Sequence, residues 1–349
     1  MASPIALVDL HTFTSPGSSS ESRLVTARSL VDALRTTGFA YISNHGVPPD
    51  LLEKAFNHSR AFFSLPQSAK MTCPHPPGWA VHRGYSWPGL EKVSGALSAV
   101  DDPAWVARLR TVQDYKESFE VGSNENPDQP NVFPDPSIIP EFETFMLGFY
   151  QRLNEVARDV LRCIAVGLNL EEDYFLSFYS GRYDQLRLLH YPPVPRTALT
   201  SGTMSRMPAH TDWSILTMLF QSDMGGLQLK DRASGEFVHV PPRGDTLVLN
   251  VGDLLMRWTN DELVSTMHRV VPPPAETAIA RSAESVVSSH NGEVEGGDGE
   301  VCPARYSIPY FVTTDPDIVI KCLEGEAGGK YEPMTQREYA AMRARMQYV

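Results

Sequence analysis

A histidine and an aspartate two residues apart stand directly before an apolar run near the middle of the chain. They are His210 and Asp212, and the run spans residues 215–220. In an extended strand, side chains at positions i and i+2 point to the same face. We therefore predict a strand that presents both side chains to one metal ion, while Thr211 points away. None of the other nine histidines has an aspartate or glutamate two positions later.

A third ligand for such a site has to come from another segment, and His268 is the best candidate. It lies in a second strand-like run, residues 263–271. Two imidazoles and one carboxylate on one side of an ion leave the opposite positions open, which is the facial arrangement of non-haem Fe(II) oxygenases. The alternative is a polar pair at a strand edge with an unrelated, exposed histidine. His45 is expected in a turn and His290 in an exposed loop, so neither is a candidate ligand.

An arginine and a serine further along the chain have the same spacing of two. Arg305 and Ser307 fall on one face of a predicted strand. An arginine fork matches a carboxylate in bidentate fashion, and a neighbouring hydroxyl adds one more donor. The pair could therefore hold the far carboxylate of a dicarboxylate whose near end chelates the metal. A surface arginine on an alternating strand is the alternative, but apolar and aromatic residues follow at 308–311.

These motifs resemble those of the isopenicillin N synthase-like branch of the 2-oxoglutarate/Fe(II)-dependent dioxygenases, and the resemblance covers nearly the whole chain. The family's His-x-Asp and distal His correspond to His210, Asp212 and His268. Its Arg-x-Ser motif corresponds to Arg305 and Ser307. The resemblance implies that the first three residues bind Fe(II), and that the other two bind 2-oxoglutarate.

The family's Asn-Tyr-Tyr-Pro-Pro segment corresponds to residues 189–193, which read Leu-His-Tyr-Pro-Pro. The resemblance implies that Tyr191 touches 2-oxoglutarate. Leu189 stands in the place of the family's asparagine and cannot make its polar contact. One cosubstrate contact of the family is therefore absent from this chain.

The resemblance implies a dioxygenase that uses Fe(II), 2-oxoglutarate and O2 to oxidise a small organic molecule, with no catalytic residue beyond the metal ligands. Hydroxylation, desaturation, cyclisation and ring rearrangement are all open outcomes, and secondary-metabolite biosynthesis is the expected setting. Two alternatives remain. One is an oxidase of the same family that works without 2-oxoglutarate. The other is a catalytically idle jelly-roll binding protein.

The elements that must position these residues begin with alternating strands and helices. The expected order is a strand at 5–10, a helix through Leu24 to Leu34, a strand at 39–43 and a helix that stops before Pro66. Residues 73–135 are irregular, with short ordered pieces at 83–86 and 116–119. A long helix then follows, with Pro140 in its first turn and Gly167 at its end.

From residue 186 onward, short strands alternate with Gly, Pro and Asp turns, which is typical of a double-sheet jelly roll. The predicted strands are 186–191, 210–220, 227–229, 237–240, 246–251, 263–271, 305–312 and 318–320. Gly225-Gly226 and Gly252 are expected at turns that need the backbone freedom of glycine.

The expected fold is mixed α/β (α+β), with a double-stranded β-helix (jelly roll) core flanked by N-terminal helices and a C-terminal helix. We predict three regions: an N-terminal region at 1–180, a jelly-roll domain at 181–316, and a C-terminal strand and helix at 317–349. A Gly-rich acidic loop at 283–301 interrupts the jelly roll. Thr335 and Glu338 have the spacing of a capping box that begins the last helix.

Composition narrows the class of protein. The chain has 349 residues and a net charge of −12, without the Lys/Arg-rich run of a nucleic-acid-binding protein. Its apolar runs are too short to span a bilayer. The four cysteines are far apart, which favours reduced thiols over a disulfide framework. We expect a cytoplasmic enzyme that acts on a small molecule, with no nucleic-acid or membrane partner; the oligomeric state stays open.

Overall fold

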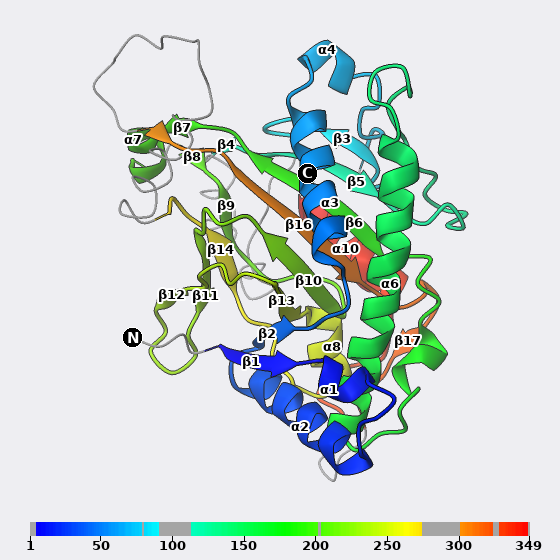
Figure 1. Cartoon of the computed structure of the whole chain (residues 1–349). Helices are drawn as coiled ribbons and strands as arrows, with labels where there is room; N and C mark the ends of the chain where they lie inside the picture. The colour runs from blue at the N-terminus through cyan, green and yellow to red at the C-terminus, as the bar shows by residue number, and fades with distance from the viewer. Residues whose placement is uncertain are drawn as a thin grey trace.

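Figure 1 shows the computed structural model, which describes residues 5–78, 80–90, 113–201, 204–273, 301–323 and 328–347. Apart from Val301, the predicted loop at 283–301 lies outside these ranges, as does His290. The expected fold is confirmed: two facing sheets form a jelly roll, and helices pack on the outside of the larger one.

Eight strands form the larger sheet, in the order β1-β2-β13-β10-β16-β6-β5-β3. All neighbours pair antiparallel except β1 and β2, which are parallel. Their bounds are β1 Ala6–Asp9, β2 Phe39–Ser43, β3 Gly84–Ser86, β5 Glu117–Val121, β6 Gln185–Tyr191, β10 Leu216–Gln221, β13 Thr246–Val251 and β16 Arg305–Val312.

The segment expected to be mostly loop at 73–135 contributes two of these strands. β5 pairs with β6, and β3 pairs with β5 at the edge of the sheet. The short ordered pieces predicted at 83–86 and 116–119 are therefore parts of the main sheet. Their pairing depends on β6, which lies far along the chain, so local sequence alone could not reveal it.

The smaller sheet has the order β12-β11-β14-β9. Its strands are β9 Met207–His210, β11 Leu227–Lys230, β12 Phe237–His239 and β14 His268–Val270. Three two-stranded pairs complete the strands: β4 Gln113–Asp114 with β8 Met204–Ser205, β7 Val194–Pro195 with β15 Val301–Cys302, and β17 Val319–Ile320 with β18 Met334–Thr335.

Strand alternation buries both faces of the larger sheet. In β13, Leu247 and Leu249 join the apolar core under the helices, while Val248 joins a second cluster with Leu227 and Leu229 of the smaller sheet. Successive side chains of a strand point to opposite faces, so one strand serves both layers. The second cluster lies between the sheets, where the predicted site residues are also found.

Helices cover the outer face of the larger sheet, with α6 the longest and α2 and α3 packed beside it (Figure 1). The helices are α1 His11–Thr14, α2 Ser20–Thr36, α3 Pro49–Phe63, α4 Gln67–Lys70, α6 Phe142–Gly167, the 3-10 helix η2 Phe175–Phe178, α7 Arg196–Thr200, α8 Asp253–Trp258 and α10 Gln336–Gln347.

The starts of helices α6 and α10 test the helix-start signals that were predicted from the sequence. Pro140 does not lie in the first turn of α6 as expected, because the left-handed residue Glu141 (φ 62°) separates it from the helix start at Phe142. The capping box of α10 is confirmed. The Thr335 N–H donates to Glu338 Oε2 at 2.8 Å, and the Glu338 N–H donates to Thr335 Oγ1 at 3.2 Å.

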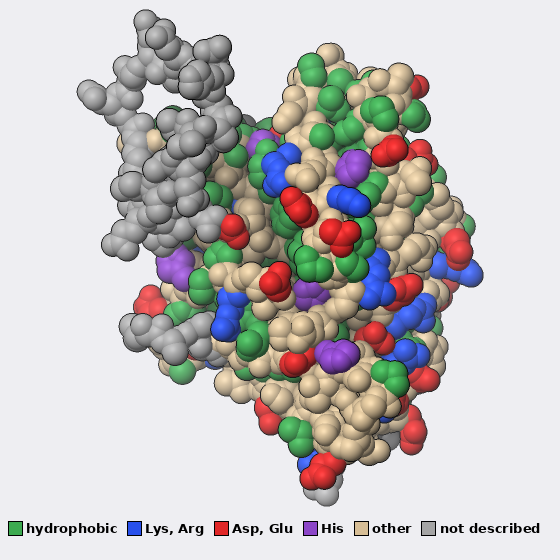
Figure 2. All heavy atoms as spheres, in the orientation of Figure 1, with side chains coloured by type: hydrophobic (Ala, Val, Ile, Leu, Met, Phe, Trp, Pro, Cys, Tyr) green, Lys and Arg blue, Asp and Glu red, His purple; other side chains and the backbone are tan. Residues whose placement is uncertain are grey.

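Two features bear on possible partners. Among the described residues, we find no helix that is both long and apolar enough to cross a membrane. On the face shown in Figure 2, Lys and Arg side chains are interspersed with Asp and Glu, and they form no continuous basic stripe.

Candidate metal centre and cosubstrate pocket

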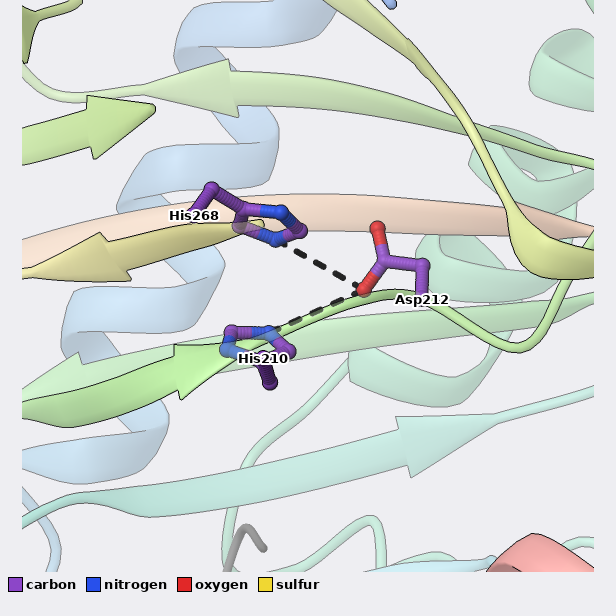
Figure 3. A group of neighbouring side chains, drawn as sticks. All are labelled: His210, Asp212 and His268. Atoms are coloured by element: carbon purple, nitrogen blue, oxygen red, sulfur yellow. Dashed lines mark ion pairs between the residues drawn. The ribbon is translucent and has the colours of Figure 1, made fainter. Parts of the chain in front are cut away.

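The structure brings His210, Asp212 and His268 together between the two sheets. His210 ends β9 and His268 begins β14, and the two residues face each other across the strand pair. The Asp212 Oδ1 atom lies 3.7 Å from the Nε2 atom of each imidazole, and the three side chains point toward one another (Figure 3). Their possible ligand atoms all lie within 4.8 Å of one another.

The predicted strand at 210–220 is wrong, and so is the reason given for the proximity of His210 and Asp212. β9 ends at His210 in the smaller sheet, and β10 begins at Leu216 in the larger one. Asp212 lies in the connection that crosses between the sheets. Backbone hydrogen bonds hold this connection, from Asp253 N–H to the Asp212 carbonyl and from Gly252 N–H to the Ile215 carbonyl, both at 2.8 Å.

The segment before the distal histidine also differs from its prediction. β14 starts at His268, so residues 263–267 are not part of that strand, and α8 stands between Gly252 and β14. Gly225 and Gly226 have positive φ, as expected, but Gly252 has φ −92°. Gly252 is needed for a different reason, because an added Cβ would lie 2.0 Å from the Ser214 carbonyl oxygen.

Backbone carbonyls orient both imidazoles. His210 Nδ1 lies 2.9 Å from the Pro208 carbonyl oxygen, and His268 Nδ1 lies 3.1 Å from that of Thr266. A carbonyl oxygen can only accept, so each Nδ1 carries the hydrogen and each Nε2 keeps a lone pair directed toward the centre. Burial, and next the electrostatic cost of a proton beside the neighbouring His268 imidazole, hold the pKa of His210 well below its usual value, which leaves it neutral as a ligand must be.

The Asp212 carboxylate is oriented through one of its oxygens. Thr217 Oγ1 donates to Oδ2 at 2.6 Å, and Asn250 Nδ2 donates to the same atom at 2.8 Å. Burial alone would raise the pKa of Asp212, but the two histidines and these hydrogen bonds lower it below its usual value. The ionised Oδ1 therefore faces the imidazoles, and the donor set suits a divalent first-row transition metal.

Sequence reasoning missed Thr217 and Asn250. Each interrupts a run of apolar residues, in β10 and β13, where the other polar residues, Gln221 and Thr246, stand at strand ends. That interruption was the available signal. The two strands are neighbours, and Thr217 pairs directly with Asn250.

The predicted cosubstrate residues also lie together. Antiparallel pairing of β6 with β16 sets Arg305 opposite Tyr191 and Ser307 opposite Leu189. Arg305 Nη1 donates to Ser307 Oγ at 2.9 Å, and its Cζ lies 5.1 Å from the centre of the Tyr191 ring. Arg305, Ser307 and Tyr191 are all buried.

Arg305 and Ser307 lie on the same face of the larger sheet as Thr217, which donates a hydrogen bond to Asp212. β16 pairs with β10, so that Phe311 stands opposite Thr217. Because side chains alternate, Arg305 and Ser307 lie on the same face of the sheet as Phe311 and Thr217. That face carries Arg305 and Ser307 near one end and Thr217, which supports Asp212, near the other.

His45 lies outside the triad, as expected. Its Nδ1 accepts a hydrogen bond from the Val47 N–H at 3.2 Å, and its ring packs edge-on against Phe220. Burial lowers the pKa of His45 to about 4. It is a structural residue of the turn after β2.

Comparison with known proteins places the chain in a family. The model described as non-haem dioxygenase in morphine synthesis N-terminal matches residues 5–141, and the model of the 2OG-Fe(II) oxygenase superfamily matches residues 182–314.

Individual relatives agree with these matches. The chain is 41% identical over 268 residues to the 2-oxoglutarate-Fe(II) type oxidoreductase ppzD of Metarhizium rileyi, covering 74% of this chain and 73% of that protein. It is 35% identical over 314 residues to the proline hydroxylase buaE of Petromyces alliaceus, covering 89% and 88%.

A solved structure extends the agreement to the fold. A full-length Neurospora crassa protein, crystallised in complex with alpha-KG and thymine, matches with a TM-score of 0.81 and 34% identity, covering 98% of this chain and 96% of that one. The chain belongs to the 2OG-Fe(II) oxygenase superfamily, as an isopenicillin N synthase-like dioxygenase that uses Fe(II) and 2-oxoglutarate.

Proposed function

We propose that His210, Asp212 and His268 bind the Fe(II) of this dioxygenase. The observation that carries the proposal is the convergence of two Nε2 atoms and one carboxylate oxygen, while the other polar atom of each side chain is hydrogen-bonded elsewhere. Such outer hydrogen bonds orient metal ligands and fix their tautomers. When bound, Fe(II) supplies the O2 chemistry that couples decarboxylation of 2-oxoglutarate to oxidation of the substrate.

The proposed cosubstrate anchor is Arg305 with Ser307 and Tyr191. A buried guanidinium beside a hydroxyl and an aromatic ring suits the far carboxylate of 2-oxoglutarate. The protein positions the ligands and the cosubstrate, and its two sheets keep both sites out of bulk water.

The proposed substrate is a small organic molecule of secondary metabolism. The names of the relatives and of the N-terminal family model support this assignment. Hydroxylation, desaturation, cyclisation and ring rearrangement remain possible outcomes of the same iron chemistry. A cytoplasmic location stays a prediction, as does the division of the chain at residues 180 and 316.

One observation favours a second candidate, the oxidase that works without 2-oxoglutarate. Leu189 stands directly opposite Ser307 and offers no polar atom where relatives are expected to have an asparagine. Succinate release separates the two candidates. Decarboxylation of 2-oxoglutarate yields succinate in step with substrate oxidation, whereas the second candidate consumes O2 with no succinate.

The metal assignment is tested with Asp212→Ala. Isothermal titration with Fe(II) under anaerobic conditions should give one site in the wild type and no measurable site in the variant. His11→Ala, at an exposed position in α1, is the matched control and should bind like the wild type. Retention of Fe(II) binding and turnover by Asp212→Ala would refute the triad. A wild type without an Fe(II) site would instead support the idle binding protein.

A further inference from the structure

A second buried arginine lies beside the proposed cosubstrate anchor. Arg206 directly precedes β9 and is only 1% exposed. Its Nη2 donates to the Pro303 carbonyl, but its buried Nε and Nη1 atoms have no hydrogen-bond partner among the residues that the structure describes. A buried charge is costly unless it is paired and hydrogen-bonded. Two unused donors on a buried cation therefore point to a ligand.

The position of Arg206 places such a ligand at the proposed 2-oxoglutarate site. The Cζ of Arg206 lies 5.9 Å from the centre of the Tyr191 ring, and the Cζ of Arg305 lies 5.1 Å from the same centre. The carbonyl that holds Arg206 belongs to Pro303, two residues before Arg305. Both guanidinium groups therefore approach one tyrosine that already belongs to the proposed 2-oxoglutarate site.

Neither guanidinium forms an ion pair within the part of the chain that the structure describes. Arg305 donates to neutral acceptors: the Gly225 carbonyl at 2.8 Å, the Ser307 hydroxyl at 2.9 Å and Gln221 Oε1 at 3.4 Å. Burial lowers the pKa of both arginines, and the like charge of Arg206 adds to the effect on Arg305. An arginine nevertheless remains protonated, so the pocket holds two positive charges in need of an anion.

The segment that carries Arg206 also carries His210, and it pairs with the strand that carries His268. His210 lies four residues further along the chain, at the end of β9, and Met207 pairs with Val270, two residues after His268. A ligand held by Arg206 would thus be fixed relative to the strand pair that presents both imidazoles. This is the position required of a cosubstrate that must lie between its anchor and the metal.

We propose that Arg206 is a second carboxylate-binding residue of the same site. This inference rests on the proposed binding of 2-oxoglutarate by Arg305. Arg206 binds the far carboxylate of 2-oxoglutarate together with Arg305. That carboxylate would place one negative charge beside the two cations and would use the donors that lack partners.

The test compares two ligands that differ only at the far end. 2-Oxopentanoate has the oxo-acid end and chain length of 2-oxoglutarate, but a methyl group replaces the far carboxylate. Dissociation constants for both are measured by isothermal titration of the Mn(II)-loaded protein, which binds the ligand without turnover. For Arg206→Met, we expect the constant for 2-oxoglutarate to rise about 10- to 100-fold and that for 2-oxopentanoate to stay unchanged.

Two further variants are measured in the same way for comparison. Arg305→Lys should show the same selective loss, because it tests the anchor of the proposed function. Arg28→Met makes the same substitution at an exposed position of α2 and should alter neither constant.

The melting temperature of ligand-free Arg206→Met should equal or exceed that of the wild type, because the substitution removes an unpaired buried charge. The rise in melting temperature on adding 2-oxoglutarate should be smaller in this variant.

Four outcomes would overturn the role of Arg206. Equal losses for 2-oxoglutarate and 2-oxopentanoate, or a lower melting temperature without ligand, would make Arg206 a structural residue. Unchanged 2-oxoglutarate binding in Arg206→Met alongside a loss in Arg305→Lys would confine the anchor to Arg305. If neither variant changes 2-oxoglutarate binding, both assignments are wrong. If only Arg206→Met changes it, Arg206 is supported and Arg305 is not the anchor.

Discussion

At the scale of single residues, each side chain of the candidate metal centre uses one polar atom for a supporting hydrogen bond and turns another toward the centre. One oxygen of Asp212 receives hydrogen bonds from Thr217 and Asn250, and the other faces the imidazoles. Each histidine likewise uses Nδ1 for a backbone carbonyl and keeps Nε2 for the centre. The side chains are thus oriented before any metal arrives, which lowers the entropy lost on binding.

The support of Asp212 can be tested at Thr217. Thr217→Val removes the hydroxyl that lies 2.6 Å from Asp212 Oδ2 and keeps a similar shape. We expect the affinity for Fe(II) or Mn(II) to fall about 10-fold or more, because the carboxylate loses part of its orientation. Isothermal titration measures the change. Thr217→Ser keeps the hydroxyl and should restore affinity; an unaltered affinity in Thr217→Val would show that Asn250 suffices.

His45 gives a prediction about acid stability. Burial lowers its pKa from 6.5 to about 4, so as the pH falls through this interval the unfolded chain takes up a proton that the folded chain does not. The free energy of unfolding should therefore decrease toward acid pH, by about 2 kcal/mol between about pH 7 and about pH 5 from this residue alone. His45→Asn keeps an acceptor for the Val47 N–H and should lack this component in urea unfolding. Parallel pH profiles for the two proteins would contradict the burial argument.

At the scale of elements, the crossing between β9 and β10 decides where Asp212 points. The crossing packs against the turn that begins α8, and Gly252 lies too close to the Ser214 carbonyl for any side chain. This close approach joins the carboxylate of the triad to the end of β13. A strand running straight through residues 210–220 would stay in one sheet and could not make the contact.

The close approach predicts a specific defect in Gly252→Ala. The added Cβ would lie 2.0 Å from the Ser214 carbonyl oxygen, so the crossing must shift. We expect a loss of about 2–4 kcal/mol in the free energy of unfolding and weaker metal binding, measured by urea unfolding and titration. Gly244→Ala is the matched control, since a Cβ there has nothing within 4 Å. Equal stability of the two variants would mean that the crossing adjusts freely.

At the scale of the whole molecule, the C-terminal helix is connected to the candidate metal centre through Asp253. One of its carboxylate oxygens accepts from Thr211, Tyr339 and Arg343, and the other accepts from Ser265, three residues before His268. Arg343 also donates to the Thr211 carbonyl at 3.3 Å. Helix α10, the crossing and the segment before β14 therefore meet at one buried carboxylate.

This junction predicts a large effect for Arg343→Met. The Arg343–Asp253 pair is buried, with 2% and 3% of the side chains exposed, and removing one partner of such a pair costs about 3–5 kcal/mol. We expect that loss in urea unfolding, together with weaker metal binding. Arg337→Met in the same helix breaks only exposed pairs with Asp128 and Asp317 and should cost about 1 kcal/mol or less. Comparable losses for both variants would refute the junction.

The sequence by itself determined the identity of the candidate ligands and the secondary elements around them. Two imidazoles and a carboxylate, and an arginine two residues from a serine, are residue types whose chemistry is fixed before folding. Local periodicity was sufficient to predict β2, α3 and β16, since the alternation of apolar residues depends only on neighbours along the chain.

Only the tertiary structure decided how these residues meet. The switch of sheet after His210, the pairing of Thr217 with Asn250, and the inclusion of β3 and β5 in the main sheet all join segments far apart in sequence. That two donors of Arg206 find no partner within the described part of the chain is also a tertiary property, because it depends on which groups surround a buried side chain. Strand register and burial arise from contacts between distant segments, and no local pattern of residue types specifies them.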